Sequence, residues 1–131
     1  MRFEGAGGAV VDFFGPTDFL RMHETYSTVD HDAPDSPESL LIGGPILTHR
    51  REAARANPIR YIDGGVPPFL IAHGDRDDIV PLQQSRLLYR ALRDRGDTAN
   101  LMVVHDDGHG FSDRAVYDRV DTFFDRYLKG S

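Results

Sequence analysis

The sequence predicts an α/β fold, a parallel three-stranded sheet flanked by helices, on three observations. Three short apolar runs are each followed by polar loop residues. Near-continuous apolar character is typical of strands that are covered on both faces. Helical patterns lie between and after these runs, so strand and helix alternate along the chain. The length of 131 residues fits a single α/β domain spanning 1–131.

The three strands are predicted from apolar runs bounded by turn-forming residues. The first is "AVVDFFG" at 9–15, the second is "PFLIAHG" at 68–74, and the third is "NLMVVHD" at 100–106. Their lengths are those of strands rather than of buried helices. Because helical segments separate them, we expect parallel pairing.

Two short helices are predicted between the first and second strands. Residues 36–44, "SPESLLIGG", begin with Ser36 as the capping residue and Pro37 in the first turn, and they end at two glycines. Residues 48–57, "THRREAARAN", form a polar helical pattern. Residues 18–35 have no regular period and are interpreted as a loop or an excursion from the sheet.

Two longer helices follow the second and third strands. The first pattern starts at Pro81, in a position suited to a first helical turn, and ends at Gly96. The second starts at Ser112, a candidate cap, and ends at Gly130. Each has an apolar face for packing on the sheet. These faces consist of Leu88, Ala91 and Leu92 in the first helix and of Val116, Val120, Phe123 and Tyr127 in the second.

Composition excludes several classes of partner and chemistry. The net charge of −6, without a separate cluster of Lys and Arg, argues against a nucleic-acid partner. The absence of cysteine removes disulfides, thiolate catalysis and cysteine-ligated zinc. No apolar run approaches the ~20 residues of a membrane span, and the N-terminus lacks the apolar core of a signal peptide. We therefore expect a cytoplasmic protein without a membrane partner.

The predicted strands end in polar loops, at the edge of a parallel sheet where catalytic groups gather. The second loop, "HGDRDD", offers Asp77 before a helix, where a carboxylate also favours the positive end of the helix dipole. The third loop places His109 between Gly108 and Gly110, which lack side-chain bulk and permit positive φ. Such a histidine is either a polar loop residue or a catalytic base. Since an aspartate can fix the tautomer of a histidine, the two loops together predict an acid–base pair.

The same two loops resemble those of a known family. The segment "PPFLIAHGDRDDIVPLQQSRLLYRALRDRG", followed by "VVHDDGHGF", resembles the C-terminal half of the α/β-hydrolase fold, in its esterase/lipase and prolyl-oligopeptidase-like branch. In that branch a strand ending in HGxxDxxVP supplies the triad acid and GHGF supplies the triad histidine. The resemblance spans residues 10–128. It implies a truncated α/β-hydrolase fold with Asp77 as the acid and His109 as the base.

The nucleophile that such a pair serves is not found in the sequence. In this fold it is a serine in a G-x-S-x-G turn, and no serine here has glycine both two residues before and two residues after it. Ser36 and Ser112 are better explained as caps, and Ser85 as a helix residue. The resemblance therefore implies a carboxylic ester hydrolase of weak or assembly-dependent activity on small esters. The alternative is a non-catalytic assembly domain derived from a hydrolase.

His105 departs from the family pattern, in which a small or proline-like residue is commoner at that point. It is interpreted as a surface histidine. A second proton carrier, or a weak metal cluster with Asp106, Asp107 and His109, are the alternatives. Because one tight loop rarely supplies a full tetrahedral site, we expect neither a native metal nor a cofactor.

A homodimer is the predicted assembly. Without the N-terminal half of the fold, the strand at 9–14 would be a sheet edge, whose unpaired N–H and C=O groups invite another chain. A two-fold axis would let this apolar strand pair with its own copy. The alternative is that residues 1–8 or 18–35 fold back over the edge.

Overall fold

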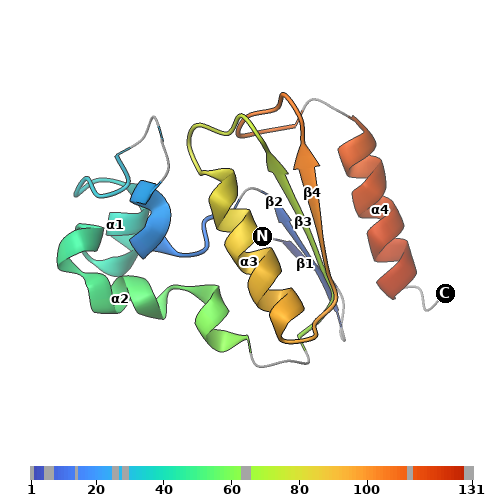
Figure 1. The fold of residues 1–131 in the computed structure, drawn as a ribbon, viewed down its shortest axis with the longest axis horizontal. Coiled ribbons are helices and arrows are strands. Elements are labelled where there is room, and N and C mark those ends of the chain that lie inside the picture. Colours follow the sequence, from blue (N-terminus) through green and yellow to red (C-terminus); the bar gives the residue numbers. More distant parts are fainter. Residues whose placement is uncertain are drawn as a thin grey trace.

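The computed structural model describes residues 2–4, 8–13, 15–24, 27, 30–62, 66–111 and 114–128, and a sheet lies at its centre. The sheet has the strand order β1-β2-β3-β4. Its strands are β1 (Arg2–Glu4), β2 (Ala9–Phe13), β3 (Phe69–Gly74) and β4 (Ala99–Val104). As predicted, β2, β3 and β4 run parallel, and their carboxyl ends meet at one edge of the molecule (Figure 1).

One long helix covers each face of the sheet (Figure 1). Helix α3 (Leu82–Asp94) packs on β3 and β4, and α4 (Arg114–Leu128) packs on β2 and β3. The predicted apolar faces are the ones that contact the sheet. Leu88, Ala91 and Leu92 of α3 are buried with Ile62, Ile71 and Ala99, and Val120 and Phe123 of α4 are buried with Ala9, Val11 and Leu70. Of the other predicted residues of α4, Val116 is buried with Ala72 and Val104, and Tyr127 is partly buried, while Phe124 joins the core without having been predicted.

The excursion between β2 and β3 forms a separate group of short helices beside α3 (Figure 1). It consists of η1 (Phe19–Glu24), α1 (Pro37–Ile42), η2 (Ile46–Thr48), α2 (Arg50–Arg55) and η3 (Pro58–Tyr61). The excursion has its own small core, which consists of Phe19, Met22, Ile46, Ala53 and Val80. Val80 belongs to the loop after β3, so this core is anchored on the segment that carries Asp77.

The helix ends follow the predicted signals with one shift. Ser36 caps α1 by accepting the Ser39 N–H at 3.0 Å. Pro81 stands one position before the first turn of α3, not inside it. Gly96 has a φ of 79° just past the end of α3. Ser112, the expected cap of α4, and Gly130, its expected stop, lie outside the described residues. Within the described part of the chain, no helix is both long enough and apolar enough for a bilayer.

The first parallel strand is not a bare edge. β1 pairs antiparallel with β2, in the register Arg2–Val11 to Glu4–Ala9. The sequence does not predict this strand, because three residues ahead of a glycine-rich stretch give too short a pattern. The unpaired N–H and C=O groups that motivated a dimer through residues 9–14 are therefore occupied along β1. A homodimer stays a prediction, which sedimentation equilibrium would test.

Candidate active site

Asp77 lies in the loop that joins β3 to α3 and organises the hydrogen bonds of that loop. Its Oδ1 accepts the backbone N–H groups of Ile79 and Val80, both at 2.9 Å. A carboxylate that binds backbone groups two and three residues ahead fixes the turn in which it stands. The side chain of Asp77 is 0% exposed, so these bonds are shielded from water.

The loops after β3 and β4 pack directly against each other at Gly74. A Cβ at this position would collide with the carbonyl oxygen of Asp107, so the close approach requires glycine. Two backbone hydrogen bonds join the loops. The Asp75 N–H donates to the Val104 carbonyl, and the Arg76 N–H donates to the Asp107 carbonyl, both at 3.0 Å. The loop with the aspartate is thus fastened to the loop with the histidine.

The predicted contact between Asp77 and His109 is present. His109 Nδ1 lies 2.8 Å from Asp77 Oδ2. Because a carboxylate only accepts, Nδ1 carries the proton, and the basic lone pair of the neutral ring is on Nε2. The His109 side chain is 31% exposed while the carboxylate is fully buried. The histidine therefore reaches the surface and the aspartate supports it from within.

The two glycines beside His109 do not serve the same purpose. Gly110 has a positive φ of 156°, which L side chains rarely adopt. Gly108 has no positive φ, and a Cβ there would meet the Arg76 carbonyl at an ordinary contact distance of 3.6 Å. Of the two glycines, only Gly110 therefore uses the positive φ that glycine permits.

Sequence reasoning misses a second histidine, His73, at the end of β3. Its Nε2 lies 2.7 Å from the Val80 carbonyl oxygen and 3.1 Å from Asp77 Oδ2. Both are acceptors, so Nε2 carries the proton and shares it between them. Its Nδ1 lies 2.6 Å from Ser85 Oγ, whose hydroxyl donates to the neutral ring. The available signal is the four-residue spacing from His73 to Asp77 in the HGxxDxxVP pattern.

These contacts hold Asp77 as a carboxylate. Burial alone would raise its pKa, but hydrogen bonds from His73, His109 and the amides of Ile79 and Val80 outweigh burial and lower the pKa to about 2. At neutral pH the buried charge is thus surrounded by donors. A fixed negative charge beside Nδ1 of His109 stabilises the imidazolium that forms when Nε2 takes a proton.

A second aspartate–histidine pair stands at the surface of the same loops. His105 Nδ1 lies 2.9 Å from Asp75 Oδ2, and the Asp106 N–H donates to Asp75 Oδ1 at 2.8 Å. The hydrogen bond from His105 is the main cause of a lowered pKa at Asp75. His105 is 82% exposed, which fits a surface histidine. Among the described residues no group of three or more His, Asp or Glu could hold a metal ion.

The excursion reaches the acid loop through the carbonyl of Ile79. His31 Nε2 lies 2.6 Å from this oxygen, and the Ser27 hydroxyl donates to it at 2.7 Å. His31 Nδ1 in turn lies 3.0 Å from Glu38 Oε1, and both side chains are buried. Since Ile79 also donates its N–H to Asp77, the excursion and the carboxylate hold the same residue from opposite ends.

The loop after β2 is built into the fold by polar groups of its own. Gln84 of α3 accepts the N–H groups of Thr17 and Asp18 on its Oε1, both at 2.6 Å. Asp12 accepts the Gly15 N–H at 3.0 Å, and burial raises the pKa of Asp12. These contacts give the polar residues after the first predicted strand a structural role.

Comparison with known proteins relates the chain, though not these side-chain contacts, to α/β-hydrolases. A family model, BD-FAE, matches residues 5–92. Esterase LipC of Mycobacterium tuberculosis is 30% identical over 105 residues, which cover 79% of this chain and 25% of that protein. The chain spans no more than a quarter of the length of the first curated relatives that it matches.

Two solved structures share the fold at moderate sequence identity. One is a bifunctional GH43-CE protein of Bacteroides eggerthii, with a TM-score of 0.76 and 36% identity, and the match covers 92% of this chain and 16% of that one. The other is a truncated form of a carbohydrate esterase from gut microbiota, with a TM-score of 0.76 and 33% identity, and the match covers 89% of this chain and 41% of that one.

Proposed function

Because the chain belongs to the BD-FAE family of α/β-hydrolases, we propose that it carries the acid and the base of a carboxylic ester hydrolase, Asp77 and His109. The observation that carries the proposal is the 2.8 Å contact between a surface-reaching imidazole and a fully buried carboxylate. Esterase LipC and the carbohydrate esterase are named for ester hydrolysis, which supports esters as the substrate class.

The proposed chemistry is general acid–base catalysis at Nε2 of His109. Nε2 takes the proton from a hydroxyl or water nucleophile as that oxygen attacks the ester carbonyl carbon. Asp77 keeps the proton of Nδ1 in place and stabilises the imidazolium. When the carbonyl re-forms and the ester C–O bond breaks, Nε2 returns the proton to the leaving alcohol. Neither residue is consumed.

The sequence contains no G-x-S-x-G turn and therefore does not supply the serine nucleophile in its usual setting. Ser85 is fully buried with its hydroxyl on His73, and Ser36 caps α1. We therefore expect full activity to need a serine from outside this sequence, in a longer chain or a second chain. By itself the 131-residue protein should activate water, with a gain of roughly 10²–10⁴-fold over solution.

The test compares hydrolysis of p-nitrophenyl acetate by the wild type, His109→Gln and His105→Gln. His105→Gln is a matched control, because it removes an exposed histidine from the same loop and from a similar aspartate contact. We expect His109→Gln to lower the rate to the uncatalysed level and His105→Gln to leave it unchanged. A wild-type rate equal to the uncatalysed rate would contradict the proposal for this chain and favour a non-catalytic assembly domain.

A further inference from the structure

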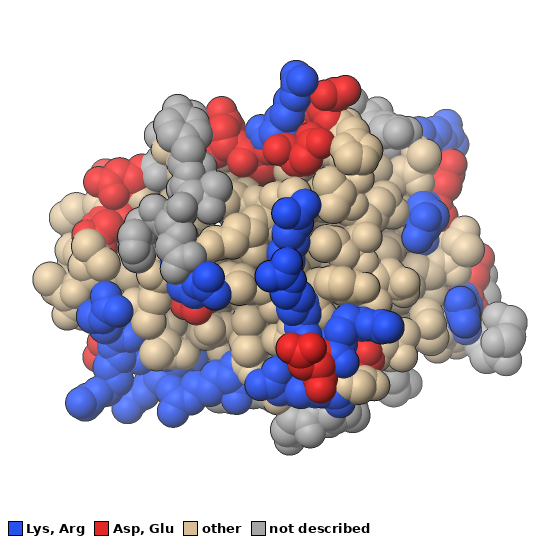
Figure 2. All heavy atoms as spheres, viewed as in Figure 1, with Lys and Arg blue, Asp and Glu red and all other residues tan. Residues whose placement is uncertain are grey.

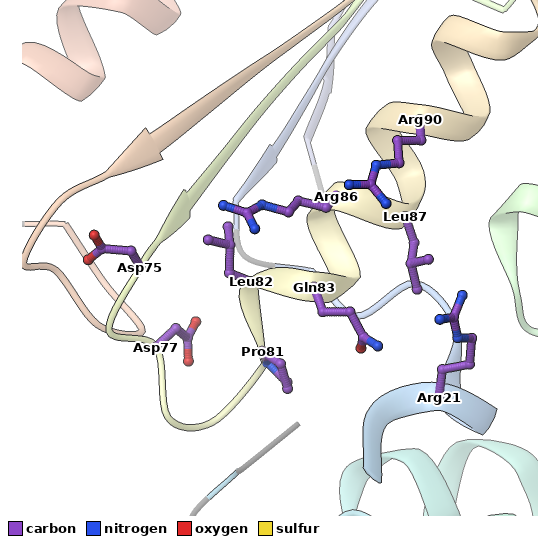
Figure 3. A pocket seen from close by; sticks show the side chains of 9 residues that line it. All are labelled: Arg21, Asp75, Asp77, Pro81, Leu82, Gln83, Arg86, Leu87 and Arg90. Carbon is purple, nitrogen blue, oxygen red and sulfur yellow. The ribbon is translucent and has the colours of Figure 1, made fainter. Parts of the chain in front are cut away.

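We propose that the hollow beside helix α3 is an anion-binding site for a small organic molecule that bears a phosphate or carboxylate group. Asp77 of the acid–base pair belongs to its lining, but His109 does not. The hollow has a volume of about 450 Å³, within the range of small-molecule sites. Its lining includes three arginines, of which Arg86 and Arg90 extend from α3 and Arg21 rises from η1 toward the same helix (Figure 3).

In the part of the chain that the structure describes, the two arginines that α3 contributes to this lining form no ion pair with an acidic side chain. Among the described residues, neither Arg86 nor Arg90 has a carboxylate within ion-pairing distance, and both side chains are exposed. They stand four residues apart on the helix, a spacing at which like charges repel each other. The pair therefore does not stabilise α3, and a bound anion would relieve the repulsion.

The start of α3 adds to the positive potential of the hollow. Pro81, Leu82 and Gln83 line it, and no side chain caps the helix at Pro81. The first N–H groups of a helix carry a partial positive charge that favours anions. Guanidinium groups and the first residues of a helix thus line the same space, in a protein whose net charge is −6.

The two acids in the lining, Asp75 and Asp77, lower this potential, but each carboxylate is bound by donors of the strand-end loops. Asp75 accepts from His105 and from the Asp106 N–H. Asp77 is fully buried and accepts from His73, His109 and its own loop. Figure 2 shows the same separation, with acidic side chains over the strand-end loops and a line of basic side chains over α3.

The lining also indicates the kind of ligand. Arginine binds the planar or tetrahedral oxygens of carboxylates and phosphates through paired N–H groups. Leu82 and Leu87, which are half-buried, offer apolar contact beside the arginines. An organic molecule with one oxyanion group and a small carbon skeleton matches both features. This site does not rest on the proposed ester hydrolysis.

The test is a titration with inorganic phosphate, and in a second arm with succinate, at constant ionic strength. Binding is followed by the 15N side-chain resonances of the arginines. We expect saturable shifts at Arg86 and Arg90, and binding about tenfold weaker or more in Arg86→Gln and Arg90→Gln, because each loses one charge-assisted contact. Arg93→Gln is the matched control on the same helix, outside the hollow, and should bind as the wild type does.

The stronger of the two arms identifies the oxyanion. Shifts that grow linearly without saturation in both arms would overturn the proposal, and so would an equal loss of binding in Arg93→Gln. Ester hydrolysis by Arg86→Gln and Arg90→Gln should equal that of the wild type, which separates this site from the acid–base pair.

Discussion

Two aspartate–histidine pairs join the same two loops, and they differ in their surroundings. His105 Nδ1 lies 2.9 Å from Asp75 Oδ2, and His109 Nδ1 lies 2.8 Å from Asp77 Oδ2. The contact geometry is nearly the same. His105 projects into water, however, whereas the carboxylate of Asp77 has no exposed surface.

The surroundings of the carboxylate decide whether an aspartate–histidine contact can support a catalytic base. Asp77 also accepts from His73 and from two loop amides, whereas Asp75 accepts one further N–H. Water competes with the exposed pair and screens it. The buried carboxylate has no solvent to replace a lost donor, so its geometry depends on its protein partners. Burial and convergent donors, rather than the distance alone, distinguish the two pairs.

The largest effect on stability is expected when the carboxylate of Asp77 is removed, and removal of the Asp75 carboxylate is the control. Asp77→Ala should lower the free energy of unfolding by about 3–5 kcal/mol, because a buried partner of several donors is lost. Asp75→Ala should leave it nearly unchanged. Urea unfolding followed by circular dichroism measures both. Equal losses in the two variants would show that burial does not separate the pairs.

A substitution at Gly74, where the two loops pack together, should disturb both aspartate–histidine pairs. Gly74→Ala should cost up to about 3 kcal/mol, because the new methyl group would collide with the Asp107 carbonyl and force the loops apart. Gly108→Ala is the control, since its Cβ has room. Thermal unfolding gives the cost, and the His105 and His109 ring resonances should change together in Gly74→Ala. Wild-type resonances in that variant would contradict the close packing.

The dependence of stability on acid pH should also distinguish the two aspartates. The pKa of Asp77 falls from its ordinary 3.8 to about 2 on folding, so ionised Asp77 contributes about 2 kcal/mol that is lost as the pH falls through about 2. Urea unfolding between neutral pH and pH 2 should lose this contribution in the wild type and in Asp75→Asn, but not in Asp77→Asn. Asp12, whose pKa is raised by burial, is common to all three proteins and cancels in the difference.

The smallest expected effect concerns the support that only the buried pair has. Ser85→Ala leaves Nδ1 of His73 without its 2.6 Å partner and should cost about 1 kcal/mol. Thermal unfolding measures the cost, and the His109 ring resonances should shift while those of His105 stay. A shift at His105 of the same size would mean that the two pairs share their support.

The parts of this molecule that were predictable depend on local pattern or on a familiar motif. The three parallel strands follow from apolar runs, and the faces of α3 and α4 follow from helical periodicity. Asp77 and His109 were predicted as partners because parallel strands bring their carboxyl ends to one edge, and their hydrogen bond is present. Their catalytic role stays a proposal.

The parts that were not predictable depend on contacts between distant segments. β1 is too short to show a period, and its pairing with β2 is decided by the sheet edge that it covers. His73 lies inside an apolar run, so the sequence predicts only a strand residue there. Its role becomes visible only from its contacts with Val80 and Ser85 in the folded chain. Arg21 and Arg86 stand 65 positions apart in the chain, so their shared hollow cannot be seen in the sequence.

Val80 belongs to two regions at once, and this links their opening motions. Its side chain lies in the core of the excursion, while its N–H and carbonyl bind Asp77 and His73. Native proteins open in cooperative units, and a residue shared in this way joins two units into one. The amide of Val80 should therefore exchange with solvent only when the excursion and the acid loop open together. Substitutions in the core of the excursion, far from His73 and His109, should therefore also change how often the loop around the Asp77 carboxylate opens, because the two regions open together.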